Sequence, residues 1–152
     1  WGAQDRLVGY KRGIASLGLD NDEKLIQKGK VSIDSGYEAM KEVLKNASPP
    51  PTAVMGANDI VAIGAMMAIK EAHLSIPEDL SVLGYDDVDI AKEVVPKLST
   101  MKVDKKKMGR LAVQQLLKLM EEEDLDSYKT IIKPSLVVRE STALAPDQEN
   151  LT

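Results

Sequence analysis

Two short phrases of the sequence end in carboxylate and amide side chains that suit the binding of a small polar molecule. They are residues 54–59 (VMGAND) and 81–87 (SVLGYDD). Each phrase begins as an apolar strand and ends in polar side chains: Asn58, Asp59, Asp86 and Asp87. In open parallel α/β sheets, ligands bind outside the carboxyl ends of the strands. The phrases therefore predict a ligand site, and they carry no comparably specific signal for bond-breaking chemistry.

These polar residues could have structural roles, or they could contact a ligand. Asp59 falls where a helix begins, and the preference for Asp at helix N-caps favours capping over ligand contact. Asn58 has no such structural role, and its amide both donates and accepts hydrogen bonds, as a hydroxyl-rich ligand requires. Asp86 and Asp87 are turn residues, acceptors for sugar or nucleoside hydroxyls, or partners of an arginine.

Arg6 is the natural complement of these carboxylates. It lies one turn into the first expected helix, either as an ordinary surface residue or as a planar fork of donors for a carboxylate, a phosphate or vicinal hydroxyls. Rings that stack on a sugar or a base are scarce, because the chain has one Trp, four Tyr and no Phe.

The residues that catalysis or metal binding would need are few. The chain has no cysteine and a single histidine, His73, which excludes thiolate chemistry, disulfides and His-rich metal sites. The sequence contains no phosphate-binding loop, dinucleotide fingerprint or nucleophile elbow. Asp59 and Asp86 could form an acid/base pair, but no nucleophile or metal set accompanies them. We therefore expect no enzyme activity, no metal and no cofactor.

The composition indicates a soluble globular protein. The 152 residues, with 43% hydrophobic and 29% charged, suffice for one domain with its own core. A net charge of −4 argues against a nucleic-acid-binding surface, which needs clustered Lys and Arg. No apolar run approaches the roughly 18 residues of a membrane span. The chain opens at Trp1 with neither a signal peptide nor an initiator Met, so we expect a cut within a longer protein.

Strands that alternate with helices predict a largely parallel α/β sheet. Apolar spacing predicts helices over residues 5–17, 37–44, 60–72 and 105–123, and a short helix over 90–95. The expected strands are 24–31, 52–56, 80–85, 98–103 and 128–139, the last as one strand or as two interrupted by Pro134. Asp59 and Asp104 are the expected N-caps of the third and fourth long helices.

The charged residues of the helix over 105–123 have the sign that the helix dipole disfavours at each end. Lys105, Lys106 and Lys107 stand at its N-terminus, and residues 121–124 are all acidic. Both ends oppose the macrodipole. The lysines are therefore either an ordinary solvated face or residues that face an anionic group across a cleft.

A series of short phrases in order resembles the effector-binding core of the lactose/galactose-repressor (LacI/GalR) family. The phrases are residues 5–10 (DRLVGY), 51–54 (PTAV), 57–59 (AND), 62–65 (AIGA), 76–87 (IPEDLSVLGYDD), 96–100 (PKLST) and 138–142 (VREST). By this resemblance the fold is α/β with a parallel sheet, a periplasmic-binding-protein-like (type I) sensor core truncated at its N-terminal side. Residues 1–142 form the C-terminal portion of that core, and 143–152 form a flexible tail.

The resemblance also implies functional positions. Arg6, Asn58 and Asp86 fall on positions that contact the effector. Val31 and Val103 fall on further cleft-lining positions, and Lys105 falls where some relatives place an aromatic ring. The positions implied for the dimer-forming face are Ile63, Met67, Val94 and Val95.

The implied function is that of a small-molecule sensor in a bacterial transcription regulator, a cytoplasmic homodimer that does not associate with a membrane. The effector is a sugar or a nucleoside-like molecule, and operator DNA is bound only through a helix-turn-helix that this chain lacks. The missing half of the core would leave an exposed sheet edge. The alternatives are a periplasmic sugar-binding protein that serves a transporter, and a small α/β enzyme that uses Asp59 and Asp86.

Overall fold

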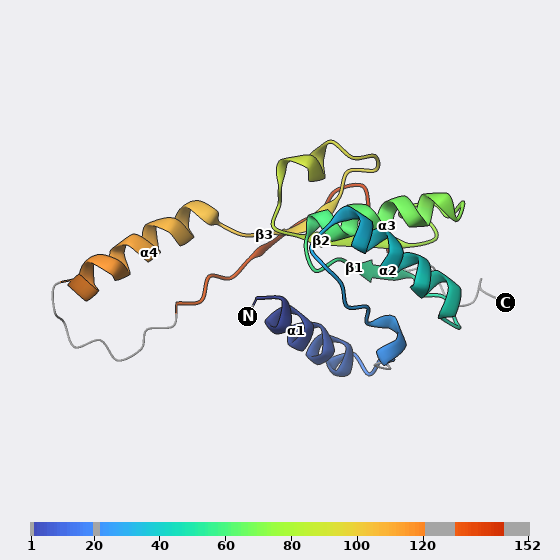
Figure 1. Ribbon diagram of the computed structural model, residues 1–152, viewed down its shortest axis with the longest axis horizontal. Helices are drawn as coiled ribbons and strands as arrows, with labels where there is room; N and C mark the ends of the chain where they lie inside the picture. The colour runs from blue at the N-terminus through green and yellow to red at the C-terminus, as the bar shows by residue number, and fades with distance from the viewer. Residues whose placement is uncertain (1, 20–21, 121–129, 145–152) are drawn as a thin grey trace.

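The sheet at the centre of the molecule has four short strands. The computed structural model describes residues 2–19, 22–120 and 130–144. The strands, in spatial order, are β1 (Ala53–Met55), β2 (Ser81–Tyr85), β3 (Ser99–Lys102) and β4 (Ser135–Val137). The first three run parallel, and β4 pairs antiparallel with β3 (Figure 1). The predicted α/β fold with a largely parallel sheet is confirmed.

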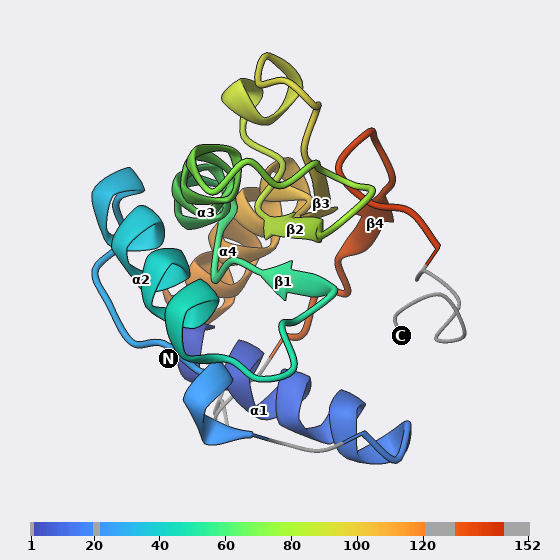
Figure 2. The same cartoon turned by 90° about the vertical axis from the view of Figure 1, so that its right-hand side faces the viewer.

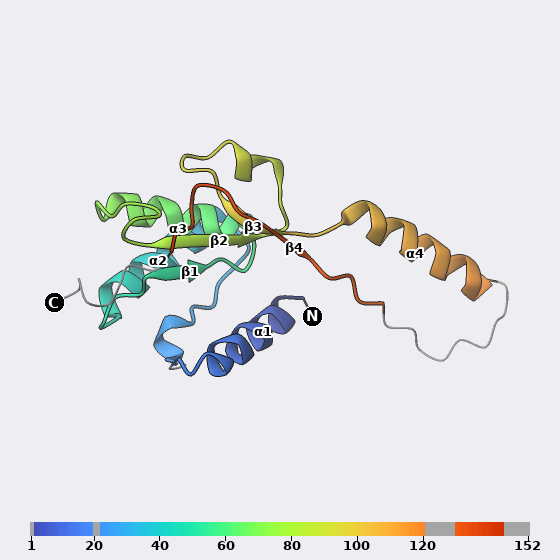
Figure 3. The ribbon, with the colours of Figure 1, turned by 180° about the vertical axis from the view of Figure 1, so that it is seen from behind.

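Two helices cover the sheet, and two others stand away from it. The helices are α1 (Gly2–Ser16), α2 (Ile33–Asn46), α3 (Asp59–Glu71) and α4 (Lys105–Met120), with 3-10 turns η1 (Glu23–Leu25) and η2 (Asp89–Lys92). α3 packs on β2 and α2 packs on α3, beside the strands (Figure 2). α4 continues past the end of β3 and points away from the sheet (Figure 3).

The hydrophobic core is centred on α3. Its buried apolar residues are Ala62, Ile63, Ala65, Met66, Ala68 and Ile69. Met40 and Val43 of α2 pack on one side of this helix, and Leu80, Val82 and Leu98, in or next to the strands, pack on the other. Burial of these side chains fixes α3 on the sheet and therefore fixes where its first turn meets the strand ends.

A pair of glycines lets α2 and α3 cross closely. A Cβ atom on Gly36 would lie 2.1 Å from the Val61 carbonyl oxygen, and one on Gly64 would lie 2.0 Å from the Ile33 carbonyl oxygen. Both distances are far inside van der Waals contact, and the clashing atoms are backbone atoms that cannot rotate away. Any side chain at either position would push the helices apart.

We expect Gly64→Ala to lower the free energy of unfolding by about 2 kcal/mol or more, because the added methyl group forces a shift of two packed helices. Urea unfolding followed by circular dichroism measures this change. Gly109→Ala is the matched control, because a Cβ at Gly109 of α4 would meet nothing within 4 Å. The control should stabilise by about 0.5 to 1 kcal/mol, as Ala does over Gly in an exposed helix. Equal effects of the two substitutions would contradict the close-crossing account.

α1 and α4 bury no side chain in the described part of the chain. The apolar stripe expected on α4 is exposed, with Leu116 at 57% and Leu119 at 59% of their accessible surface. α1 is held to the rest by stacking of Arg6 on Tyr85 and by an ion pair between Lys11 and Glu23. Most helical stability in proteins comes from packing of an apolar face, so both helices present surface suited to further packing.

Several predicted elements differ from the structure. The strand expected over 24–31 is wrong, because η1 and irregular backbone occupy these residues and no described strand pairs with them. The expected strand over 128–139 is shorter and begins after Pro134, and its residues 128–129 lie outside the described ranges. The short helix expected over 90–95 is the 3-10 turn η2. The expected end of the last long helix at residue 123, and most of the tail at 145–152, also lie outside those ranges.

Within the ranges that the structure describes, no helix has both the length and the apolar character that a membrane crossing needs.

Candidate ligand-binding site

The carboxyl ends of β1, β2 and β3 meet at one edge of the sheet because the three strands are parallel. The residues that follow these ends are the ones singled out from the sequence. Asn58 follows β1, Asp86 follows β2, and Val103 and Lys105 follow β3. The edge therefore collects most of the predicted ligand contacts, as in other open α/β sheets.

The turn after β2 has an unusual backbone that is fixed at every amide. Asp86 has φ of 109° and Asp87 has φ of 51°, in the left-handed region that residues with a Cβ rarely adopt. The Asp86 N–H donates to the Met101 carbonyl at 2.9 Å, and the Asp87 N–H donates to Thr100 Oγ1 at 3.4 Å. The Val88 N–H donates to Asp59 Oδ2 at 2.8 Å. Such conformations persist only where the surroundings over-determine them.

Asp59 is the anchor of this turn. Its side chain is fully buried, and besides Val88 it accepts a hydrogen bond from the Thr100 hydroxyl at 2.5 Å. A Cβ atom on Gly84 would lie 2.2 Å from Asp59 Oδ1, so the carboxylate occupies the space that a side chain on β2 would fill. Asp59 thus joins α3, β3 and the turn after β2.

Asn58, and not Asp59, is the residue that caps α3. Asn58 is the N-cap of α3, and its side-chain oxygen accepts a hydrogen bond from the Val61 N–H at 3.0 Å. Asp59 is the first residue of the helix, so its side chain turns into the core instead of capping. The assignment of Asp59 as N-cap was therefore wrong. The capping bond uses the Asn58 oxygen, and its NH2 group is the part left to donate to a ligand.

Asp87 pairs with an arginine, which is one of the roles expected from the sequence. Its carboxylate pairs with Nη2 of Arg139 and lies 3.8 Å from Lys102 Nζ, and only 8% of its side chain is exposed. Burial raises the pKa of Asp87, but the hydrogen bond and charge of Arg139, with smaller effects of Lys92 and Lys102, lower it by more. The net result is a pKa below the ordinary value.

Asp86 differs from its neighbours because its side chain is not engaged by the protein. Its backbone is fixed, its side chain is half-buried, and no hydrogen bond or ion pair of its carboxylate occurs within the described ranges. A carboxylate held in this way is an acceptor for hydroxyl groups of a ligand at the strand end.

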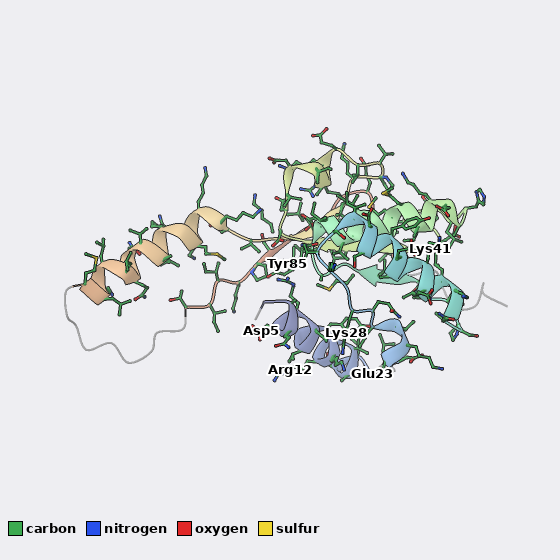
Figure 4. The ribbon with its side chains drawn as sticks, in the orientation of Figure 1. Asp5, Arg12, Glu23, Lys28, Lys41 and Tyr85 are labelled. Carbon is green, nitrogen blue, oxygen red and sulfur yellow. The ribbon has the colours of Figure 1, made fainter. Side chains whose placement is uncertain are left out.

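Arg6 contacts Tyr85, the residue before Asp86. The guanidinium carbon of Arg6 lies 4.6 Å from the centre of the Tyr85 ring, a cation–π contact. Tyr85 is the last residue of β2, and Figure 4 shows it on the side of the sheet toward α1, which carries the labelled Asp5. Nε of Arg6 is shielded from solvent and has no hydrogen-bond partner among the described residues. An unpaired buried donor is costly, and an acceptor on a ligand would remove that cost.

The remaining predicted residues are more dispersed. Val31 is 71% exposed, Val103 is half-buried and Lys105 is exposed. His73 lies just after the C-cap of α3, has φ of 59° and is exposed. Among the described residues no group of three or more His, Cys, Asp or Glu side chains could hold a metal ion.

The residues implied for the dimer face differ in exposure. Met67 is 52% exposed and Val95 is 73% exposed, whereas Val94 is half-buried. Ile63 is only 5% exposed and packs in the core, so it has little surface to offer a partner.

The described residues also form two hollows away from Asp86. One, of about 230 Å³, lies mainly along the start of β1 and β2 and is lined by Thr52, Ala53, Val54, Ser81, Leu83, Thr142 and Ala143. The other, of about 320 Å³, lies beside the start of α4 and is lined by Lys102, Asp104, Lys107, Ile132, Lys133 and Ser135. Asp86 therefore lies at an open edge of the sheet and outside both hollows.

Residues 1–142 match the family of the periplasmic binding protein-like domain. The chain belongs to this family. Its relatives include the ribose operon repressor of Haemophilus influenzae, which is 36% identical over 140 residues, 91% of this chain and 42% of that protein. The chain thus spans less than half the length of this relative.

Solved structures agree with this assignment. A transcriptional regulator CelR–cellobiose complex matches with a TM-score of 0.84 and 31% identity, over 90% of this chain and 41% of that one. The lac repressor dimer bound to operator and the anti-inducer ONPF matches with a TM-score of 0.83 and 32% identity, over 93% and 48%. The predicted membership in the LacI/GalR family is confirmed. Because the curated relatives are repressors, the alternative of a transporter's binding protein is not supported.

Arg139 and Thr100 are the site residues that the sequence did not reveal. Their partners lie far away along the chain: Thr100 is 41 residues from Asp59, and Arg139 is 52 residues from Asp87. A charged residue directly after the apolar run 136–138 (LVV) is the one local signal for a buried ion pair.

We expect Asp59→Asn to lower the free energy of unfolding by about 2 to 4 kcal/mol, because a buried amide offers one acceptor oxygen where the carboxylate offers two. Either the new NH2 group faces the Val88 N–H, or it turns to Thr100 Oγ1 and the Thr100 hydroxyl loses its acceptor. Urea unfolding measures the change. Asp34→Asn, in the exposed first turn of α2, is the control and should leave stability almost unchanged. A small effect at Asp59, equal to the control, would show that the buried carboxylate does not anchor the turn.

The lowered pKa of Asp87 predicts how stability depends on pH. Its ion pair stabilises the fold above the unfolded-state pKa of about 3.9, and this contribution is lost as pH falls through the lower folded-state pKa. The stability difference between the unsubstituted chain and Asp87→Asn should therefore shrink from roughly pH 5 down to roughly pH 2. Urea unfolding at a series of pH values tests this. A difference that stays constant over that interval would contradict it.

Proposed function

We propose that this chain is the C-terminal, effector-sensing part of a bacterial transcription repressor. The observation that carries the proposal is the turn after β2, where every backbone amide is fixed and the Asp86 side chain alone is left to meet a ligand. Family membership and the repressor relatives support the same function. No enzyme activity is part of the proposal.

The proposed effector is a sugar or a nucleoside-like molecule. Asp86 accepts hydrogen bonds from its hydroxyls, the NH2 group of Asn58 donates, and the Arg6 fork supplies further donors. Val31, Val103 and Lys105 line the remaining wall. One relative is named for the ribose operon, and one structural neighbour was solved with cellobiose, which supports a sugar as the first class to test.

The proposed mechanism is a change of population between two states of the whole repressor. The effector lies in a cleft of which this chain supplies one wall, and its contacts favour one arrangement of the two subdomains. Asp86 and Arg6 contact the effector more closely in one arrangement than in the other. Effector binding therefore favours that arrangement and, by thermodynamic linkage, changes the affinity for the operator. Operator DNA is bound by residues outside this chain, in a homodimer that works in the cytoplasm.

The proposed dimer face lies on α3 and the segment after η2. Met67 and Val95 are its exposed apolar residues, and Val94 lies at its edge. Lys70 Nζ donates a hydrogen bond to the Val95 carbonyl and holds this segment on α3. Ile63 supports the face from the core.

We expect Asp86→Ala to abolish binding of a sugar that the unsubstituted chain binds, because the ligand loses its main acceptor. Isothermal titration calorimetry with ribose and with cellobiose measures this effect. Asp89→Ala is the control, because Asp89 lies in the adjacent η2 turn and its side chain is fully exposed. Unchanged affinity in Asp86→Ala would remove Asp86 from the site, and turnover of a bound sugar would favour the enzyme alternative.

A further inference from the structure

Hydrogen bonds hold the segment that follows β4 against the sheet, and they join residues far apart in the sequence. The Ser141 hydroxyl donates to the Val82 carbonyl at 2.6 Å and accepts from the Ser99 N–H at 2.8 Å. The Arg139 N–H donates to Ser99 Oγ at 2.8 Å. The backbone of Arg139 is therefore held at a definite place beside the start of β3.

The side chain of Arg139 reaches from this anchored backbone to the turn after β2. Its Nη1 donates to the Leu98 carbonyl at 2.7 Å, and its Nη2 pairs with the Asp87 carboxylate. Only 13% of the Arg139 side chain is exposed, so the ion pair is shielded from solvent. Such a charge-assisted pair restrains both partners more strongly than a surface pair does.

Asp87 is one peptide bond from Asp86, and both have positive φ. Rotation of Asp87 toward an extended backbone would move its carboxylate away from Arg139 and would reorient the preceding residue. The Asp87 N–H has only the 3.4 Å hydrogen bond to Thr100 to hold it, so its side chain is the stronger restraint.

We propose that Arg139 is a positioning residue that holds Asp86 in its ligand-facing conformation through Asp87, so that the segment after β4 controls effector affinity. The proposal rests on the proposed function in one respect, that Asp86 binds the effector. Arg139 itself engages only protein groups, the Asp87 carboxylate and the Leu98 carbonyl.

The test compares Arg139→Gln, Arg139→Lys and Asp87→Asn with Glu140→Gln in the full chain. Glu140 lies on the same segment and pairs with Lys97 at 3.3 Å, so its variant loosens the segment without touching the turn. Circular dichroism confirms the fold. Should Arg139→Gln fail to fold, Asp87→Asn carries the test, because it keeps the size of the side chain and removes the charge.

The first readout needs no ligand. Amide hydrogen exchange and HN–Hα couplings report the backbone of Asp86, Asp87 and Val88. We expect exchange at these amides to rise roughly tenfold or more in Arg139→Gln and Asp87→Asn, less in Arg139→Lys, and not in Glu140→Gln. The amides of α2 should keep their rates, which separates a local effect from general destabilisation. Unchanged exchange and couplings at the turn would overturn the proposal.

The second readout is affinity for ribose or cellobiose. We expect Arg139→Gln to weaken binding roughly tenfold or more with Glu140→Gln unchanged. If Arg139→Gln raises exchange at the turn but binds the sugar with unchanged affinity, Arg139 does not position Asp86 for binding. If the unsubstituted chain binds neither sugar, the exchange data alone decide whether Arg139 holds the turn, because this chain supplies only one wall of the proposed cleft.

Discussion

The arrangement of the strand ends depends on one buried carboxylate. Asp59 enters the core at the first turn of α3, occupies the space that Gly84 leaves on β2, and accepts hydrogen bonds from Thr100 and Val88. A buried carboxylate is costly unless its hydrogen-bonding capacity is used, so its partners cannot be moved independently. Because those partners lie on β3 and on the turn after β2, a single side chain sets the relative position of three elements. The position of the Asp86 backbone follows from this arrangement, because Asp86 lies in that turn.

A second set of polar contacts closes the same region from the C-terminal side. Ser141 joins β2 to β3, and Arg139 joins the segment after β4 to Asp87. The core subdomain is therefore held by apolar packing around α3 and by polar contacts at the strand ends. α1 and α4 lack comparable packing, and the described part of each helix buries no side chain.

Much of this could be predicted from the sequence, and the failures have physical causes. The spacing of apolar residues predicted the parallel strands and the helices, because the side chains that an element buries recur with the period of that element. The cap of α3 was misassigned because two adjacent polar residues, Asn58 and Asp59, both suit a helix start. A shift of the helix boundary by one position changes which of the two side chains caps the helix and which enters the core. Residues 24–31 have strand-like composition, but a strand forms only with a partner beside it. The pairs Asp59–Thr100 and Asp87–Arg139 join distant segments, so no local pattern could indicate them.

We propose that the effector binds at the edge of the sheet around Asp86. Chemical-shift mapping by ¹H–¹⁵N NMR with ribose and with cellobiose tests it most directly, because weak binding is enough to perturb nearby amides. The account predicts that the largest saturable changes fall on Asp86, on Asn58 and on Arg6 with its neighbour Tyr85. Changes confined to the hollow lined by Thr52, Ser81 and Thr142, near the opposite ends of the strands, would contradict it.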